Sequence, residues 1–228
     1  MSLPAGLLRA PIAHRGLWRG GGAPENSLAA FEAACRAGYG IELDVRLSAD
    51  GEVMVFHDDT LERMTASSGM VEEQTADELR ALRLLGSDQA IPTLDQVIRL
   101  IDGRVMVLVE LKTPPGQEGL LESRVADLLA RSPGAAAVLS FNAEALAWMK
   151  SHALRISRGL NAQTAEQLST AALAGADFLS VALDLAAHPE VQAWRRTGKV
   201  IAWTARCAAD RDRMADLADN LIFEGFKA

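Results

Sequence analysis

The chain has 228 residues, of which 49% are hydrophobic and 23% are charged, and its formal net charge is −7 at pH 7. This length suits one domain with a full core, so residues 1–228 are predicted to form a single domain. The acidic balance excludes an extended nucleic-acid-binding surface, which needs a basic stripe. No apolar run approaches the roughly 20 residues of a membrane helix, and no export signal is evident, so a cytoplasmic protein without membrane insertion is expected.

Short β-type runs alternate with helical patterns along almost the whole chain. The eight strand candidates are residues 11–14, 40–47, 104–111, 136–141, 155–160, 177–181, 199–204 and 220–223. Seven helical patterns cover residues 27–37, 94–101, 120–130, 143–150, 165–173, 189–196 and 209–217. Strict alternation predicts parallel strands with helical crossovers. The pattern therefore favours an α/β fold of the (β/α)8 TIM barrel type over the alternative, a doubly wound open sheet.

The first strand candidate ends in IAHRG, which carries His14 and Arg15 to the strand end where a barrel has its active site. Histidine is suited to proton transfer near neutral pH, and the arginine fork binds phosphate or carboxylate oxygens. A lone histidine at a strand end is more often only hydrogen-bonded. This motif by itself therefore does not establish a catalytic site.

Two short β-type runs follow in GIELDVRLSADGEVMVFHDD. Because side chains alternate along a strand, Glu42 and Asp44 share a face. The Asp-Gly pair is typical of a two-residue hairpin turn, and counting outward from it pairs Asp44 with His57. Two close carboxylates repel each other, and a divalent cation removes that cost; hard oxygen ligands favour Mg²⁺ or Ca²⁺, with Mn²⁺ also possible. The alternative is a solvated strand end whose acids pair with arginine or lysine.

Residues 58–91 are polar and partly helical and are predicted to form a short insertion on the barrel rim. The next buried strand, VMVLVELK, ends in Glu110 and Lys112 on one face. They would add a third carboxylate for the cation and a positive charge for an anionic substrate. The alternative is an ion pair that closes the barrel mouth.

These motifs, in this order, resemble the glycerophosphodiester phosphodiesterase family, within the wider group of phospholipase-C-like phosphodiesterase barrels. The resemblance covers nearly the whole chain, through IAHRG, APENSLAAFEAACRAG, IELDVRLSADGEVMVFHDDTLERMT, IPTLDQVI, VELK, SFN and AWT. It implies metal-dependent hydrolysis of a small glycerophosphodiester to sn-glycerol 3-phosphate and an alcohol. It also implies roles for eight residues: Glu42, Asp44 and Glu110 as ligands of one divalent cation, His14 and His57 as an acid/base pair, Arg15 and Lys112 as cations near the phosphate, and Trp203 as an aromatic pocket wall.

Several residues near these motifs have more than one interpretation. Helix capping explains Asn26, in the PEN motif, as well as a substrate contact does. Trp203 fits a barrel core as well as a pocket wall. The chain ends in NLIFEGFKA where the family is expected to show Thr-Asp-Pro, so Phe223 and Glu224 leave the shape and charge of the alcohol-binding side undecided.

Two other functions remain alternatives. Lysophospholipase D-type cleavage of lysophospholipids would use the same metal and histidines in a pocket that admits an acyl chain, although the sequence shows no amphipathic membrane-binding helix. A noncatalytic phosphodiester-binding barrel would be expected to lack a histidine or a metal ligand, and none is missing. The sequence does not assign the acid and the base, the head group, direct water attack or a cyclic intermediate, or the oligomeric state.

Overall fold

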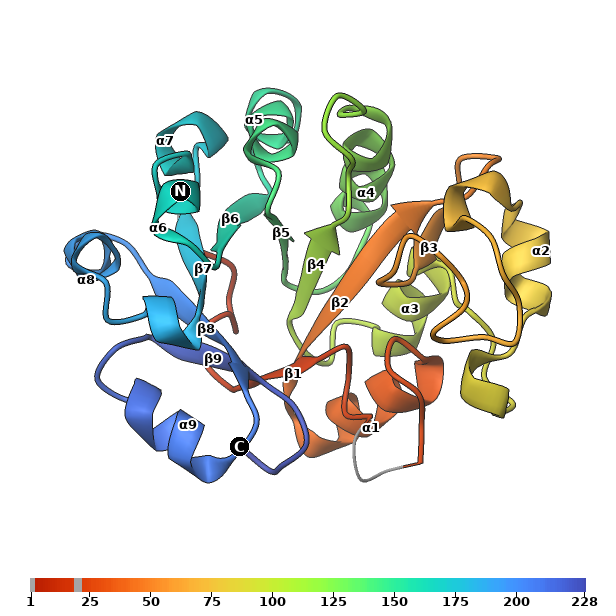
Figure 1. The fold of residues 1–228 in the computed structure, drawn as a ribbon, viewed down its shortest axis with the longest axis horizontal. Coiled ribbons are helices and arrows are strands. Elements are labelled where there is room, and N and C mark those ends of the chain that lie inside the picture. The colour runs from red at the N-terminus through yellow and green to blue at the C-terminus, as the bar shows by residue number, and fades with distance from the viewer. Residues whose placement is uncertain (1–2, 19–21) are drawn as a thin grey trace.

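A closed barrel of parallel strands forms the centre of the molecule, with helices around its outside (Figure 1). The computed structural model describes residues 3–18 and 22–228. The barrel strands are β1 Ile12–His14, β2 Gly40–Leu47, β4 Val107–Leu111, β5 Ala136–Ser140, β6 Ser157–Ala162, β7 Phe178–Ala182, β8 Val200–Ala205 and β9 Asn220–Phe223. Strand β1 pairs in parallel with both β2 and β9, which closes the barrel. The predicted TIM barrel is confirmed, and the open sheet is excluded.

Helices cover the outer face of the barrel and connect successive strands (Figure 1). The α-helices are α1 Leu28–Ala37, α2 Ala76–Ala81, α3 Leu94–Ile101, α4 Leu120–Ala130, α5 Ala143–His152, α6 Ala165–Leu168, α7 Ala171–Ala174, α8 Pro189–Arg195 and α9 Ala208–Met214. The described residues also form the short 3-10 helices η1 Val71–Glu73, η2 Leu84–Gly86 and η3 Leu183–Leu185. Within the described ranges, none of these helices is long and apolar enough to cross a membrane.

One predicted helix, residues 165–173, is divided into α6 and α7. The hydroxyls of Ser169 and Thr170 donate to the carbonyls of Glu166 and Gln167, both at 2.7 Å. Serine and threonine compete in this way with the hydrogen bonds of a continuing helix. The local side-chain bonds therefore explain the break that hydrophobic periodicity did not predict.

Two apolar layers hold the barrel together. Alternate strand residues point outward under the helices or inward to the barrel axis. The inner layer consists of Leu7, Ile12, Met106, Leu108, Ala137, Leu139, Phe178, Ile201 and Ile222. Leu7, which precedes β1, is fully buried with these strand residues. The interior is therefore a packed core, and polar inward-facing residues are left for the carboxyl ends of the strands.

Strand β3 Val53–Val55 runs antiparallel to β2 and forms the expected hairpin. The predicted two-residue turn is wrong, because the Ser48 backbone donates to the Glu52 carbonyl at 3.0 Å and leaves a three-residue loop, residues 49–51. Gly51 ends that loop in a left-handed conformation with φ 79°. The register shifts by one, so Asp44 accepts a backbone hydrogen bond of 3.0 Å from Phe56 and does not lie opposite His57. His57 therefore reaches the barrel mouth from the loop beyond β3.

Residues 58–91, the segment predicted to form an insertion on the barrel rim, lie beside β3 at one edge of the molecule (Figure 1). This segment contains η1, α2 and η2, and an apolar cluster of its own joins it to the hairpin. That cluster consists of Met54, Phe56, Leu61, Met64, Val71, Ala76, Leu79, Leu84 and Ile91. The hairpin thus supplies side chains to the insertion core on one side and to the barrel on the other.

Candidate active site

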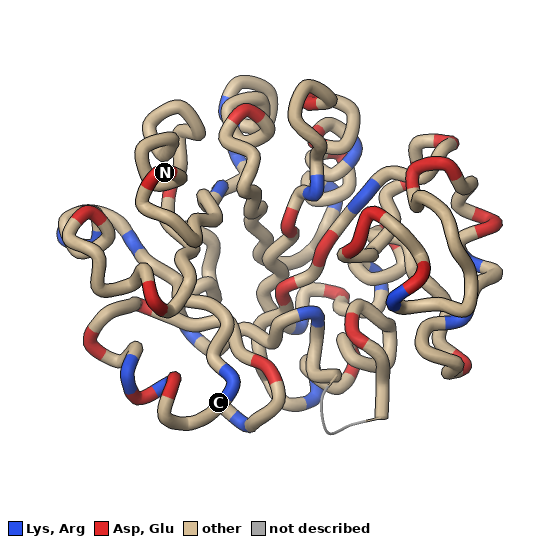
Figure 2. Tube along the Cα trace, in the orientation of Figure 1, with Lys and Arg blue, Asp and Glu red and all other residues tan. Residues whose placement is uncertain are grey.

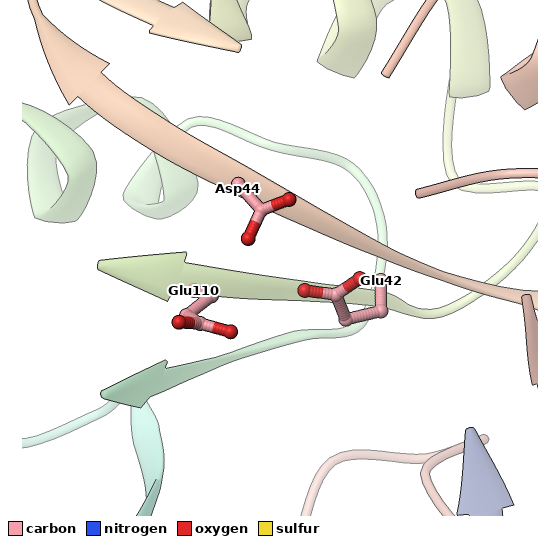
Figure 3. A group of neighbouring side chains, drawn as sticks. All are labelled: Glu42, Asp44 and Glu110. Carbon is pink, nitrogen blue, oxygen red and sulfur yellow. The ribbon is translucent and has the colours of Figure 1, made fainter. Parts of the chain in front are cut away.

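Three carboxylates from two neighbouring strands face one another at the barrel mouth (Figure 3). Glu42 and Asp44 belong to β2, and the strand register pairs Asp44 with Glu110 of β4. One oxygen from each side chain lies within 4.8 Å of the others. The residues are only 1%, 1% and 8% exposed, respectively. This is a buried acidic cluster and not a solvated strand end.

Two cations contact the acidic cluster. Lys112 Nζ bonds to Glu110 and lies 3.1 Å from Asp44 Oδ1, while Arg15 Nε lies 3.1 Å from Asp44 Oδ2. Along β2 and β4, acidic and basic residues accordingly lie close together (Figure 2). Burial alone would raise the pKa of Asp44, but Lys112 and Arg15 hold that pKa far below its usual range. Burial, followed by repulsion from Asp44 and Glu110, raises the pKa of Glu42 well above its usual range.

The donor set fits a divalent cation. Glu42 accepts a hydrogen bond of 3.1 Å from the Arg15 backbone through Oε2, while its buried Oε1 has no hydrogen-bond partner among the residues described. A buried carboxylate oxygen normally has a partner, and oxygen atoms are the ligands preferred by hard cations. A positive ion would also reduce the repulsion that raises the pKa of Glu42. The three carboxylates can therefore hold one metal ion.

Each pocket histidine is bonded through Nδ1 to a carboxylate. His14 Nδ1 lies 2.8 Å from Glu224 Oε2, and its Nε2 lies 3.9 Å from Glu42 Oε2. His57 Nδ1 lies 2.6 Å from Asp58 Oδ1. Burial lowers the pKa of His57 below its usual range, although the charge of Asp44 opposes this shift. With Nδ1 engaged, Nε2 is the nitrogen that each ring offers to a substrate.

Glu224 was not predicted to contact a histidine. It follows β9, which lies next to β1 in the closed barrel, and its other oxygen accepts a 2.9 Å hydrogen bond from Arg206. A carboxylate directly after the last barrel strand is the sequence signal that could have indicated this contact. By contrast, Phe223 is fully buried outside the pocket, with its ring centroid 4.8 Å from that of Tyr39. Only Glu224 of this pair therefore affects the charge of the pocket.

Residues of the PEN motif contact the acidic cluster and one of its cations. Asn26 Nδ2 donates to Asp44 Oδ2 at 2.9 Å, and Ser27, not Asn26, caps helix α1. The capping explanation for Asn26 is therefore wrong. Glu25 accepts hydrogen bonds of 2.7 Å from both Arg15 and Arg63. Because Arg63 also binds the aspartate that follows His57, a continuous set of polar contacts links the two sides of the mouth.

A single pocket contains seven of the eight residues predicted for the site, and Asp44 lies directly beside them. The residues that line this pocket are His14, Arg15, Glu42, His57, Glu110, Lys112, Leu139, Phe141, Asn161, Gln163, Trp203, Thr204, Arg206 and Ile222. Trp203 thus lies in the pocket wall, where its ring is nearly perpendicular to that of Phe141 with centroids 5.7 Å apart. The pocket combines acids, cations, histidines and one largely uncharged wall.

Comparisons with known proteins agree on one family. The model of the glycerophosphoryl diester phosphodiesterase family matches residues 14–223. A glycerophosphodiester phosphodiesterase of Caldanaerobacter subterraneus subsp. tengcongensis is 40% identical over 112 residues, which are 45% of this chain and 44% of that protein. The chain spans about half the length of the first curated relatives it matches.

Solved structures are similar over almost the full chain. A phosphodiesterase of Oleispira antarctica, solved in complex with the product sn-glycerol-3-phosphate, is 27% identical with a TM-score of 0.85. The alignment covers 95% of this chain and 92% of that one. A glycerophosphodiester phosphodiesterase of Agrobacterium tumefaciens str. C58 is 26% identical with a TM-score of 0.78, covering 95% of this chain and 96% of that one.

Proposed function

Because the chain belongs to the glycerophosphoryl diester phosphodiesterase family, we propose that it hydrolyses glycerophosphodiesters to sn-glycerol 3-phosphate and an alcohol. The observation that carries this proposal is the meeting of a buried acidic cluster, two carboxylate-paired histidines and two cations in one pocket. The complex of the similar Oleispira antarctica protein with sn-glycerol-3-phosphate supports the same substrate class.

The charged residues would bind the phosphodiester. Glu42, Asp44 and Glu110 would hold one Mg²⁺ or Ca²⁺ ion, with Mn²⁺ also possible, which when bound polarises the phosphoryl oxygens. Arg15 and Lys112 would neutralise the charge that develops on the non-bridging oxygens during the reaction. Both cations are already positioned by the buried carboxylates, so little reorganisation is needed as the charge develops.

The histidines would move the protons. One of His14 and His57 takes the proton of the attacking hydroxyl, from water or from the glycerol 2-hydroxyl, as the new bond to phosphorus forms. The other gives a proton to the alcohol oxygen as its bond to phosphorus breaks. Glu224 lies within hydrogen-bonding distance of His14 Nδ1, and Asp58 of His57 Nδ1, so the two carboxylates orient the rings.

The test is release of sn-glycerol 3-phosphate from glycerophosphocholine by the purified protein. Activity should disappear with EDTA and return when Mg²⁺, Ca²⁺ or Mn²⁺ is added. Turnover that is insensitive to EDTA would exclude the metal-dependent reaction, and no turnover of any glycerophosphodiester with any of these ions would exclude the proposed function. Phosphorus NMR during turnover distinguishes a cyclic phosphate intermediate from direct attack by water.

A further inference from the structure

The wall formed by β6, β7 and β8 contains three buried polar atoms that have no partner within residues 3–18 and 22–228. Asn161 of β6 is 3% exposed, and its Oδ1 has no hydrogen-bond partner among the described residues. The register pairs Asn161 with Ser180 of β7, which is fully buried and whose Oγ is likewise unpaired in the described part of the chain. The buried Nε1 of Trp203 on β8 is the third such atom.

These atoms are unusual because proteins pair nearly all of their buried polar groups. Asn161 and Trp203 line the pocket that contains the acidic cluster, so the location of these two residues explains their unpaired atoms. In strand order, β7 and β8 lie across the barrel from β2 and β4, which carry the carboxylates, and β6 is the neighbour of β7. A ligand that reaches across the pocket from the cluster would therefore meet an acceptor on Asn161 and a donor on Trp203.

The chemistry of this wall favours an uncharged, hydroxylated ligand. A hydroxyl group can donate to Asn161 Oδ1 and accept from Trp203 Nε1, whereas a quaternary ammonium group has no hydrogen to donate. The other residues of this wall, Gln163 directly after β6 and Thr204 of β8, carry no formal charge. Arg206 also lines the pocket, but its positive charge is paired with Glu224 and gives a cation no attraction.

We propose that Asn161 and Trp203 bind the departing alcohol and select a hydroxyl-rich, uncharged alcohol such as glycerol over choline. This inference rests on the proposed hydrolysis of glycerophosphodiesters and specifies the head group. Loss of one hydrogen bond to a substrate hydroxyl in a buried site can change discrimination by at least 10-fold. Asn161 would therefore be a specificity-determining residue.

The competing occupant is choline itself. Phe141 and Trp203 form a perpendicular pair at the pocket wall, and aromatic faces attract quaternary ammonium groups. The two ligands differ in their need for Asn161, because only the hydroxylated alcohol can donate a hydrogen bond to its amide oxygen. Substitution of this one residue therefore separates the two possibilities.

The experiment compares kcat/KM for glycerophosphoglycerol and glycerophosphocholine in the metal-loaded protein. The unsubstituted protein should prefer glycerophosphoglycerol by about 10-fold or more, and Asn161→Leu should lower that ratio by about 10-fold. Asn161→Asp should move the preference further toward the cationic choline ester. Thermal unfolding gives a second measurement: Asn161→Leu should not lower the Tm, because it removes an unpaired buried oxygen.

Asn220 provides a matched control. Its Nδ2 donates to the carbonyls of Leu7 and Ala10 at 2.7 and 2.8 Å, away from the pocket. Asn220→Ala should lower the Tm without changing the ratio of the two substrates. A substrate ratio that Asn161→Leu leaves unchanged, or a large fall in its Tm, would overturn the inference. Failure of the unsubstituted protein to cleave either substrate with any cation would instead overturn the proposed function.

Discussion

The carboxylates that hold the two pocket histidines have different origins. Asp58 directly follows His57 in the chain, whereas Glu224 is 210 positions from His14 and reaches it only across the β9–β1 junction. Each carboxylate is also held by an arginine, Arg63 for Asp58 and Arg206 for Glu224. A carboxylate fixed in this way sets the orientation of the imidazole without itself taking the proton.

Loss of either histidine tests the proposed proton transfers. His14→Ala and His57→Ala should each lower kcat by roughly 100- to 10,000-fold, which is the usual contribution of a positioned acid or base. His152→Ala is the matched control, because His152 lies exposed at the end of α5 and bonds to the carbonyl of Trp148. Steady-state release of sn-glycerol 3-phosphate measures the effect, and circular dichroism checks the fold. If His14→Ala or His57→Ala kept more than about a tenth of the activity, the result would contradict the acid/base role of that histidine.

Glu224→Gln tests whether that carboxylate positions His14. The amide keeps the size of the side chain but removes its charge, so kcat should fall by about 10- to 100-fold, less than on loss of the histidine. KM should change little, because Glu224 contacts His14 through Nδ1 and is not one of the residues that line the pocket. Glu73→Gln, on an exposed part of η1, controls for the loss of one acid. A rise in KM at constant kcat would indicate a role in substrate binding instead.

The insertion is connected to the barrel by both apolar and charged contacts. Its apolar cluster includes Phe56 of the hairpin, while Arg63 reaches back to Asp58 and to Glu25. Burial alone would raise the pKa of Asp58, but hydrogen bonds from Arg63 and His57 lower it to about 2. Because the carboxyl has an ordinary pKa of 3.8, its ionised form favours the folded state.

This shift predicts a pH-dependent contribution to stability. The stabilisation by Asp58 should be complete above about pH 5 and should be lost as the pH falls through 3.8 toward 2, because protonation then favours the unfolded chain. Asp58→Asn should lower the free energy of unfolding by about 1 kcal/mol near pH 6, after allowance for solvent screening, and by less near pH 3. Urea denaturation at the two pH values measures the difference. Asp77→Asn on α2 is the exposed control, and a deficit for Asp58→Asn that stayed constant with pH would contradict this electrostatic cause.

The β2–β3 hairpin shows the limit of sequence patterns at the level of elements. Strand alternation placed Glu42 and Asp44 on one face, and the structure confirms this. The turn type was wrong because an Asp-Gly pair also suits a three-residue loop with its glycine in the left-handed conformation. A change of one residue in register exchanges the faces of a strand, so His57 could not be placed by counting from the turn.

Closure of the barrel requires complementary side chains along its axis. Phe178 of β7 is fully buried in the interior, and the register places it beside Gly159 of β6. A Cβ atom at that glycine would collide with the ring of Phe178 and with the side chain of Leu139. The large and the small residue therefore fit together below the pocket.

Gly159→Ala tests this packing. The added methyl group should lower the free energy of unfolding by about 1–3 kcal/mol through overpacking. In combination with Phe178→Leu, which makes space, the loss should be smaller than the sum of the two single effects, because residues in contact are not independent. Denaturant unfolding of the four proteins gives the coupling energy. Additive effects would show that the ring does not limit the space at this position.

Local patterns in the sequence were sufficient for the fold class and for placing the acids, His14, Arg15 and Lys112 at strand ends. The register that brought His57 to Asp44 was wrong, and Trp203 was assigned only from the family resemblance. The alternation of strands and helices and the motifs at strand ends are short-range features, and parallel strands bring their carboxyl ends to the same rim. The tertiary structure decided the long-range contacts that hold those residues. Glu224 meets His14 only because β9 closes against β1, and Asn161 meets the same pocket only because β6 lies across the barrel. Such contacts depend on chain closure over long separations, which no local periodicity encodes.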